Sequence, residues 1–207
     1  NPSLAPANSP PPRLIYVTPS HQYPTGVTMP TPRRLALLDH ASHAGSWIIE
    51  DDYDSEFRYD TPPTPSLQGL AAQTSVIYVG TFSKVLYPGL RLGYLVLPDT
   101  LAEAFKLAHA RLHREGNYPV QSALAEFIAN GHFSRHISRM RSAYRQRQAC
   151  LRQALAPAVT KGLKLSEGHA GMHLLATLQS AEEEALLVKS ANESGLTLSP
   201  LSRYYLS

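Results

Sequence analysis

Short apolar runs alternate with a helical pattern along the first hundred residues, and this alternation constrains the fold more than any other feature. The runs are rich in β-branched and aromatic residues, as strands are, and comprise Leu14–Val17, Trp47–Ile49, Val76–Val79 and Leu92–Leu97. Thr31–Gly45 has the spacing of a helix with a proline in its first turn. Strands joined through a helix imply parallel pairing, so we expect an α/β fold with a mostly parallel sheet.

Beyond Pro98 the pattern becomes helical. Two apolar stripes at helical spacing are predicted, one on Leu101, Phe105, Ala108 and Leu112 and a longer one on Phe133, Ile137, Met140, Tyr144, Leu151 and Leu155. A smaller α+β region should follow, with a helix over Ala181–Ser194 and strands near Leu163–Leu165, Met172–Leu178 and Leu196–Ser199. The proline-rich Tyr59–Leu70 is expected to be a loop.

This pattern divides the chain into three parts. Residues 1–13 hold five prolines and little periodicity, which is typical of a flexible arm or linker. Residues 14–130 are predicted to form a partial large domain around the sheet. Residues 131–207 should form a long connecting helix and part of a C-terminal small domain.

A lysine follows the third strand within a segment rich in hydroxyl and basic groups. Lys84 comes just after Thr81 and Ser83, and Arg91 follows it in the chain. An amine displayed at a strand end can form a Schiff base with an aldehyde cofactor, while hydroxyls and a guanidinium can bind its phosphate. The segment therefore indicates a pyridoxal phosphate site; the alternative is an ordinary lysine on an exposed loop.

Acidic residues and a tyrosine follow the second strand, within the segment Glu50–Phe57. Charges at the carboxyl edge of a sheet need partners, and a cationic pyridinium ring would be one. A carboxylate facing the ring nitrogen would keep it protonated, and a phenol could hydrogen-bond the cofactor's phenolic oxygen. A solvated acidic loop is the other interpretation, but the coincidence with the lysine segment favours a cofactor site.

The segments EDDYDSEFRYD and GTFSKVLYPGLRLGY resemble the aminotransferase domain of MocR-type regulators, the GntR-family transcription factors that carry a fold-type I, class I/II aminotransferase domain. Tyr16–Gly26 and Gly131–Arg145 are similar to that family's cofactor-side loop and connecting helix. The similarity runs from about Leu14 to Tyr205. It implies pyridoxal 5'-phosphate as the cofactor and the fold of a PLP-dependent transferase large domain.

The resemblance also assigns roles to individual residues. It makes Lys84 the Schiff-base lysine, Asp51 the partner of the pyridine nitrogen and Tyr53 the donor to the phenolic oxygen. The phosphate ligands that it implies are Thr81, Ser83 and Arg91.

Two further residues are matched by position near the cofactor. Arg203 lies where the family places the arginine that binds a ligand carboxylate, a role suited to its planar fork of donors. Ordinary aminotransferases read Asn-Pro-Thr-Gly in the cofactor-side loop, whereas this chain has Tyr23-Pro24-Thr25-Gly26. Tyr23 is therefore a cofactor-contact candidate whose role stays open.

The resemblance begins in the middle of the family's large domain, so we expect a fragment that lacks the N-terminal half. The glycine-rich phosphate loop, the aromatic that stacks on the ring and the winged-helix DNA-binding domain are not in the sequence. DNA would then be bound only through a winged helix outside these residues, and a homodimer is expected for the full-length form. The fragment alone is expected to bind cofactor weakly and to associate.

Three functions follow from these patterns. The first is the effector-sensing domain of a regulator, which forms an aldimine with an amino-acid-like carboxylate ligand. The second is a freestanding aminotransferase that transfers an amino group to a 2-oxo acid. The third is an inactive truncated fragment.

Composition and motif spacing exclude several other classes. No apolar run approaches the ~20 residues of a membrane span, and no signal-peptide pattern is present, so a cytoplasmic location without membrane association is expected. No metal site is predicted, because the helical pairs His40/His43 and His132/His136 lack a third ligand.

Arginines gather on the other face of the long helix, at positions 135, 139, 141, 145, 147 and 152. They could form a nucleic-acid stripe. A solvated outer helix face is favoured, because no base-stacking aromatics accompany them.

Overall fold

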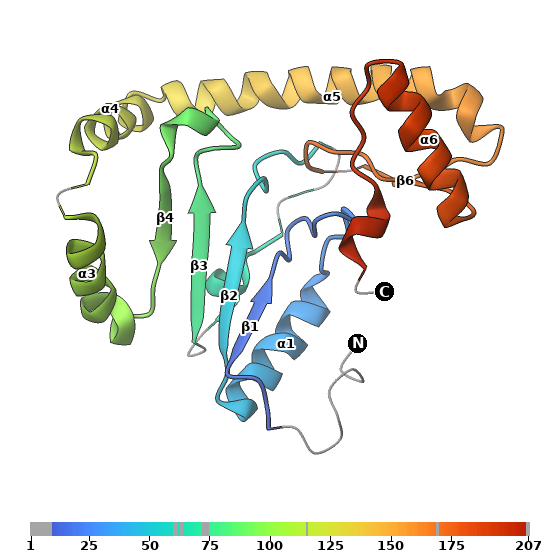
Figure 1. The fold of residues 1–207 in the computed structure, drawn as a ribbon. Helices are drawn as coiled ribbons and strands as arrows, with labels where there is room; N and C mark the ends of the chain where they lie inside the picture. The colour runs from blue at the N-terminus through green and yellow to red at the C-terminus, as the bar shows by residue number, and fades with distance from the viewer. Residues whose placement is uncertain are drawn as a thin grey trace.

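A four-stranded sheet forms the centre of the computed structural model, which describes residues 10–59, 62, 64–71, 75–114, 116–168 and 170–205. Its strands, in spatial order, are β1 (Leu14–Val17), β2 (Trp47–Asp52), β3 (Val76–Thr81) and β4 (Gly93–Val96). The first three are parallel and β4 runs antiparallel to β3 (Figure 1). The expected α/β fold with a mostly parallel sheet is confirmed, and β2 and β3 extend further than predicted.

Two helices cover one face of this sheet. Helix α1 (Thr31–Ala44) ends at Gly45, which takes the left-handed conformation at φ 64°. Helix α2 (Leu67–Leu70) begins at Ser66, whose side chain accepts the Gly69 N–H. The core between helices and sheet is a cluster of buried side chains: Leu38, Ala41, Ile48, Leu67 and Val76. The prediction of loop throughout Tyr59–Leu70 is wrong over its last four residues, because the Ser66 cap starts a helical turn there.

A buried ion pair fastens both helices to β2. The Glu50 carboxylate accepts the N–H groups of Leu67 and Gln68 at 2.8 and 2.9 Å, and Arg34 Nη1 lies 3.6 Å from it. Arg34 donates in addition to three backbone carbonyls, those of Pro19, Met29 and Pro65. Burial raises the pKa of Glu50 above its ordinary value. The first acid of the predicted cluster is therefore part of the framework.

Three helices follow the sheet: α3 (Asp99–His113), α4 (Tyr118–Ala129) and α5 (His132–Val159). Helix α5 crosses above the carboxyl ends of the parallel strands (Figure 1). A second core forms beneath it, made by the buried side chains Phe57, Tyr59, Val85 and Ile137. The predicted long stripe supplies part of this core, whereas no residue of α3 is buried in the described chain.

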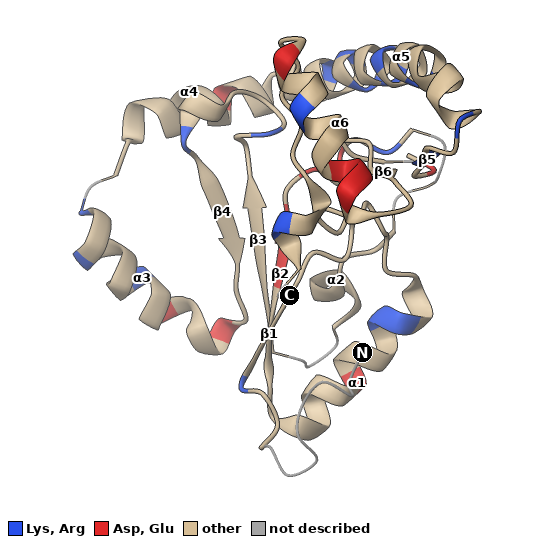
Figure 2. Cartoon of the chain, turned by 45° about the vertical axis from the view of Figure 1, so that its right-hand side comes forward, with Lys and Arg blue, Asp and Glu red and all other residues tan. Residues whose placement is uncertain are grey.

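Figure 2 shows Lys and Arg along α5. Arg141 Nε donates to the Glu56 carbonyl at 2.5 Å, Arg145 donates to the Tyr59 carbonyl, and Arg152 donates to the Glu167 carbonyl at 2.5 Å. These three side chains bind the loops beneath the helix, while Arg141 and Arg145 remain exposed, as expected for a solvated outer helix face. Each guanidinium thus donates to a backbone carbonyl of a loop that lies beneath the helix.

The C-terminal region is smaller than the sheet region. It contains the short antiparallel pair β5 (Lys164–Leu165) and β6 (Ala176–Thr177), helix α6 (Ala181–Glu193) and the 3₁₀ turn η3 (Leu201–Tyr204). The strand expected over Met172–Leu178 is reduced to β6.

Leu196–Ser199 is not a strand, contrary to the prediction. Instead of joining a ladder, Leu196 donates its N–H to the Ala191 carbonyl at the end of α6. The apolar run therefore starts at the C-terminal cap of α6 and does not pair with a strand of the described residues.

The predicted division into three parts stays a prediction. Residues 1–9 of the expected arm lie outside the described residues, while Arg13 accepts the Trp47 N–H with its carbonyl at the start of β2. No helix in the described part of the chain is both long and apolar enough to cross a membrane.

Candidate functional site

The second face of the sheet carries the polar residues that the sequence singled out. Tyr16 is in register with Ile49, and Asp51 is in register with Val79. Side chains alternate along a strand, so Tyr16, Asp51 and Thr81 project from the same face, opposite to the one that α1 and α2 cover. Tyr16 is 62% exposed there. The carboxyl ends of three parallel strands thus bring these groups to one open surface.

Asp51 is the acid of its segment that reaches this surface. Its carboxylate accepts a hydrogen bond from the Tyr16 phenol, which raises the pKa of Tyr16 to about 12. Asp52 points the other way, where it accepts from the Tyr78 hydroxyl at 2.8 Å and from the Ser55 N–H at 3.1 Å. Alternation along β2 therefore separates two adjacent carboxylates into an open and a buried environment.

Lys84 lies in the tight turn that follows β3. The Ser83 N–H donates to Thr81 Oγ1 at 3.1 Å, and the Leu86 N–H donates to the Phe82 carbonyl at 2.9 Å. Val85 is buried at 2% exposure and anchors the turn, whereas Lys84 is exposed. The turn holds the lysine backbone rigidly while leaving its amine accessible.

The chain continues from the Lys84 turn into a short 3₁₀ segment, η2 (Pro88–Leu90), and Arg91 directly follows that segment. The Phe82 N–H donates to the Leu92 carbonyl at 3.0 Å, which places the arginine segment beside the end of β3. Arg91 has φ 51°, a left-handed conformation that residues with a Cβ rarely adopt. The structure thus brings together Asp51, Thr81, Ser83, Lys84 and Arg91 around the ends of β2 and β3.

Tyr53 is engaged differently from what the resemblance implies. Its hydroxyl donates to the His21 carbonyl at 2.6 Å. Burial, together with Asp54 and Asp51, raises the pKa of Tyr53. The phenol has one proton to donate and it is used here, so the predicted donation to a cofactor oxygen requires the hydroxyl to turn away from this carbonyl.

Tyr23 connects the cofactor-side loop to the C-terminal turn that carries Arg203. The hydroxyls of Tyr23 and Tyr204 lie 2.7 Å apart, and their rings meet edge to face at 5.3 Å. Glu184 accepts the Leu201 N–H at 2.5 Å, which fixes the start of η3. Arg203 is exposed and lies next to this contact. The fold therefore brings Tyr23 into contact with the turn that carries Arg203.

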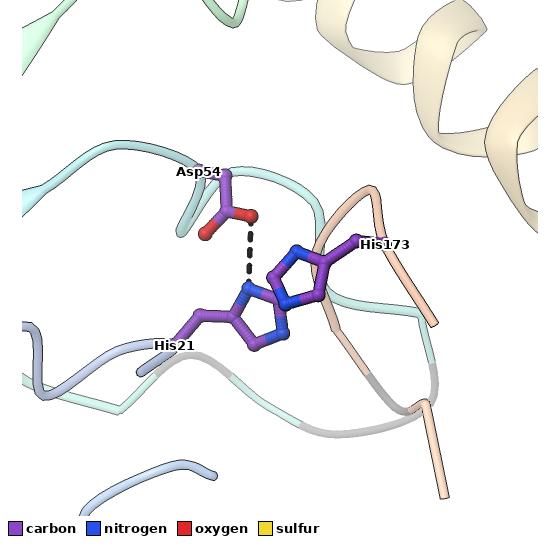
Figure 3. Close-up of side chains that lie close together, drawn as sticks. All are labelled: His21, Asp54 and His173. Carbon is purple, nitrogen blue, oxygen red and sulfur yellow. Dashed lines mark hydrogen bonds and ion pairs between the residues drawn. The ribbon is translucent and has the colours of Figure 1, made fainter. Parts of the chain in front are cut away.

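Sequence reasoning missed a cluster formed by His21, Asp54 and His173 (Figure 3). His21 Nδ1 lies 2.9 Å from Asp54 Oδ2, and the two imidazole rings have centroids 4.5 Å apart. Burial, followed by the charge of His21, lowers the pKa of His173. His21 and Asp54 both lie inside the segments quoted for the resemblance, but His173 lies far along the chain and only the fold brings it to them.

Comparison with known proteins identifies the fold and the family. The sequence model of the family described as aminotransferase class I and II matches residues 4–207. The probable rhizopine catabolism regulatory protein MocR of Rhizobium meliloti is 42% identical over 206 residues, covering 98% of this chain and 41% of that protein. The uncharacterized HTH-type transcriptional regulator YhdI of Bacillus subtilis is 43% identical over 197 residues, covering 94% of this chain and 42% of that protein. The chain thus spans about two fifths of the length of these relatives.

Solved structures agree with this. The crystal structure of Pyrococcus horikoshii kynurenine aminotransferase in complex with PMP superimposes with a TM-score of 0.82 at 30% identity, covering 89% of this chain and 46% of that one. Pyridoxal phosphate is the cofactor of this fold, as expected from the sequence. The chain therefore belongs to the aminotransferase class I and II family, and its aminotransferase-like domain is of the kind that MocR-type regulators carry.

Proposed function

We propose that this domain binds pyridoxal 5'-phosphate at Lys84 and senses an amino-acid-like ligand for a MocR-type transcriptional regulator. One observation carries the proposal: Asp51, Thr81 and the Lys84 turn lie at the carboxyl ends of adjacent parallel strands, around the sheet face that α1 and α2 leave open. In α/β sheets this edge is where ligands bind.

The chemistry of the donor set fits the cofactor. Thr81, Ser83 and Arg91 supply hydroxyls and a guanidinium on one stretch of chain, which suits a phosphate dianion. Asp51 supplies a carboxylate on the neighbouring strand, which suits a protonated ring nitrogen. Tyr16 holds that carboxylate in place by donating to it. The segment at the end of β3 thus matches the negative phosphate, and Asp51 on β2 matches the positive ring nitrogen.

Each residue then has a defined task. Pyridoxal phosphate, when bound, supplies an electron sink for amino-acid chemistry. Asp51 keeps the ring nitrogen protonated, and the Lys84 amine is the nucleophile that anchors the cofactor and accepts or returns a proton. Arg203 binds the ligand carboxylate from η3, and the Tyr23–Tyr204 contact sets the position of that turn.

The sensing role is favoured over catalysis by the higher identity to the two regulators than to the kynurenine aminotransferase. In this role the ligand would change how the C-terminal region sits on the sheet region, and a winged-helix module would convert that change into DNA binding. A homodimer in the cytoplasm is part of the same proposal. The kinship with aminotransferases keeps a freestanding enzyme as the second candidate function.

Spectrophotometric titration with pyridoxal phosphate tests the proposal. For the full-length protein we expect one cofactor per chain, with an absorbance band that Lys84→Ala abolishes, whereas residues 1–207 alone should bind the cofactor weakly. Lys106→Ala is the matched control, because Lys106 is 78% exposed and contacts only Glu103 among the ion pairs of the described residues. Equal binding by the Lys84→Ala variant and the parent protein would contradict the assignment.

A second measurement separates the two candidate functions. The cofactor-loaded protein is mixed with single standard amino acids and pyruvate, and 2-oxo acid product is counted per chain. A sensor should change its spectrum with at most one product per chain, whereas an aminotransferase would turn over many times. Multiple turnovers would decide for the enzyme, and a spectrum unresponsive to any amino acid would support the inactive-fragment interpretation.

A further inference from the structure

The cluster of His21, Asp54 and His173 joins three separate segments of the chain. His21 lies in the loop after β1, Asp54 in the loop after β2, and His173 in the loop that leads to β6. One nitrogen or oxygen from each residue lies within 4.8 Å of the others. His21 is 4% exposed and Asp54 is 1% exposed. The cluster is therefore an interior contact between the sheet region and the C-terminal region.

Two polar atoms of the cluster are left without a hydrogen-bond partner. Among the residues that the structure describes, neither Asp54 Oδ1 nor His173 Nε2 has a hydrogen-bond partner, and both atoms are shielded from solvent. An unpaired buried polar atom costs about 1–3 kcal/mol, more if it carries charge. A buried polar group without a partner in the protein indicates that a bound ion or water molecule supplies the missing interaction.

A proton on His21 would not complete the cluster. It would neutralise the Asp54 charge through the 2.9 Å contact, but Asp54 Oδ1 and His173 Nε2 would still lack partners. A cation with several coordination positions could use the carboxylate and both imidazoles at once. Two imidazole nitrogens and one carboxylate form a donor set of borderline softness, typical of Zn²⁺ rather than of Ca²⁺ or Mg²⁺.

We propose that His21, Asp54 and His173 form a zinc-type divalent metal site that ties the C-terminal region to the ends of β1 and β2. Three protein ligands leave a fourth position for water. Ligand atoms about 2.0–2.1 Å from a tetrahedral ion lie about 3.3 Å apart. The His21–Asp54 contact of 2.9 Å opens slightly and the widest separation of up to 4.8 Å closes.

The surroundings hold the first ligand in place. The Tyr53 hydroxyl fixes the His21 backbone through its carbonyl at 2.6 Å. Gly171 has φ 77°, and a Cβ built on it would lie 1.9 Å from the His21 ring. The segment that carries His173 thus approaches His21 as closely as only glycine allows. None of the three proposed metal ligands is assigned to the cofactor chemistry proposed above, so metal binding and cofactor binding can be tested separately.

Metal binding is measured on protein purified without a histidine tag, stripped with EDTA and titrated with Zn²⁺ and with Co²⁺. We expect one ion per chain, a Co²⁺ visible spectrum of a four-coordinate site with nitrogen ligands, and a rise in melting temperature that EDTA reverses. His173→Gln and Asp54→Asn should each lower Zn²⁺ affinity about 100-fold or more. His43→Gln is the control, because His43 is 79% exposed and should leave affinity unchanged.

If a variant fails to fold, metal binding by the stripped parent protein is the measurement that decides. Failure of the stripped parent to bind Zn²⁺ or Co²⁺ at micromolar concentration would overturn the proposal. Binding that survives in folded His173→Gln protein would also overturn it. In either case the cluster is a hydrogen-bonded contact between two regions of the chain.

Discussion

Asp51 and Asp52 are neighbours in sequence whose surroundings differ because β2 alternates. Asp51 faces the open side and accepts only from Tyr16 among the hydrogen bonds of the described residues, whereas Asp52 is buried against Tyr78 and Ser55. The same substitution at the two positions should therefore have different consequences. Replacing Asp51 should change the cofactor chemistry, whereas replacing Asp52 should lower the stability of the fold.

Asp51→Asn should leave the melting temperature almost unchanged but slow amino-group exchange by one to several orders of magnitude, because an amide cannot hold the ring nitrogen protonated. Asp52→Asn should lower the free energy of unfolding by about 1–2 kcal/mol, because charge-assisted hydrogen bonds are weakened. Thermal melts and stopped-flow absorbance with a panel of amino acids measure both effects. The reverse pattern would mean that Asp52 faces the ring.

Arg91 combines a costly backbone conformation with a proposed role in phosphate binding. At φ 51° a residue with a Cβ costs about 1–2 kcal/mol, which glycine does not. Arg91→Gly should therefore be more stable than Arg91→Ala by about 1 kcal/mol in urea unfolding. Both should lose phosphate affinity equally. If Arg91→Gly bound cofactor as tightly as the parent, the guanidinium would not be a ligand.

At the scale of elements, the Arg34–Glu50 pair determines how α1 and α2 sit on β2. Arg34 and Glu50 are completely buried, and together they satisfy two N–H groups and three carbonyls. Removing one partner of such a pair leaves an uncompensated charge in the interior, which costs about 3–5 kcal/mol. The pair is therefore a sensitive point in the framework under the proposed site.

Arg34→Met should lower the melting temperature by about 10 °C, at about 2–4 °C per kcal/mol for a chain of this size. Arg33→Met, one residue earlier on the exposed side of α1, should change it by no more than about 2 °C. Differential scanning calorimetry measures both. Similar melting temperatures for the two variants would show that the ion pair is not structural.

At the scale of the whole molecule, local patterns predict the four-stranded sheet, α6 and β5 well, and the strands expected over Met172–Leu178 and Leu196–Ser199 poorly. Apolar runs predict all four strands because each is buried or paired along most of its length. Leu196–Ser199 has the same apolar pattern, but no strand in the described part of the chain pairs with it, and hydrophobicity alone cannot reveal whether a partner exists. The Ser66 cap was missed because a four-residue helix leaves too short a periodic signal.

The candidate site divides in the same way. Asp51, Thr81 and Lys84 could be predicted, because they follow strands that pair in parallel and so end at one edge. The engagement of Tyr53 with the His21 carbonyl could not, because it depends on how a loop folds back. The contact of His173 with His21 and Asp54 joins residues more than a hundred positions apart, and no local pattern encodes it.

Locating the cofactor on the chain tests the central claim most directly. The cofactor-loaded protein is reduced with borohydride, digested with trypsin and analysed by mass spectrometry. A modified Lys84 blocks cleavage there, so the account predicts a phosphopyridoxyl peptide that spans Tyr59 to Arg91. Adducts on Lys106, Lys161, Lys164 or Lys189 with an unmodified Lys84 would contradict it.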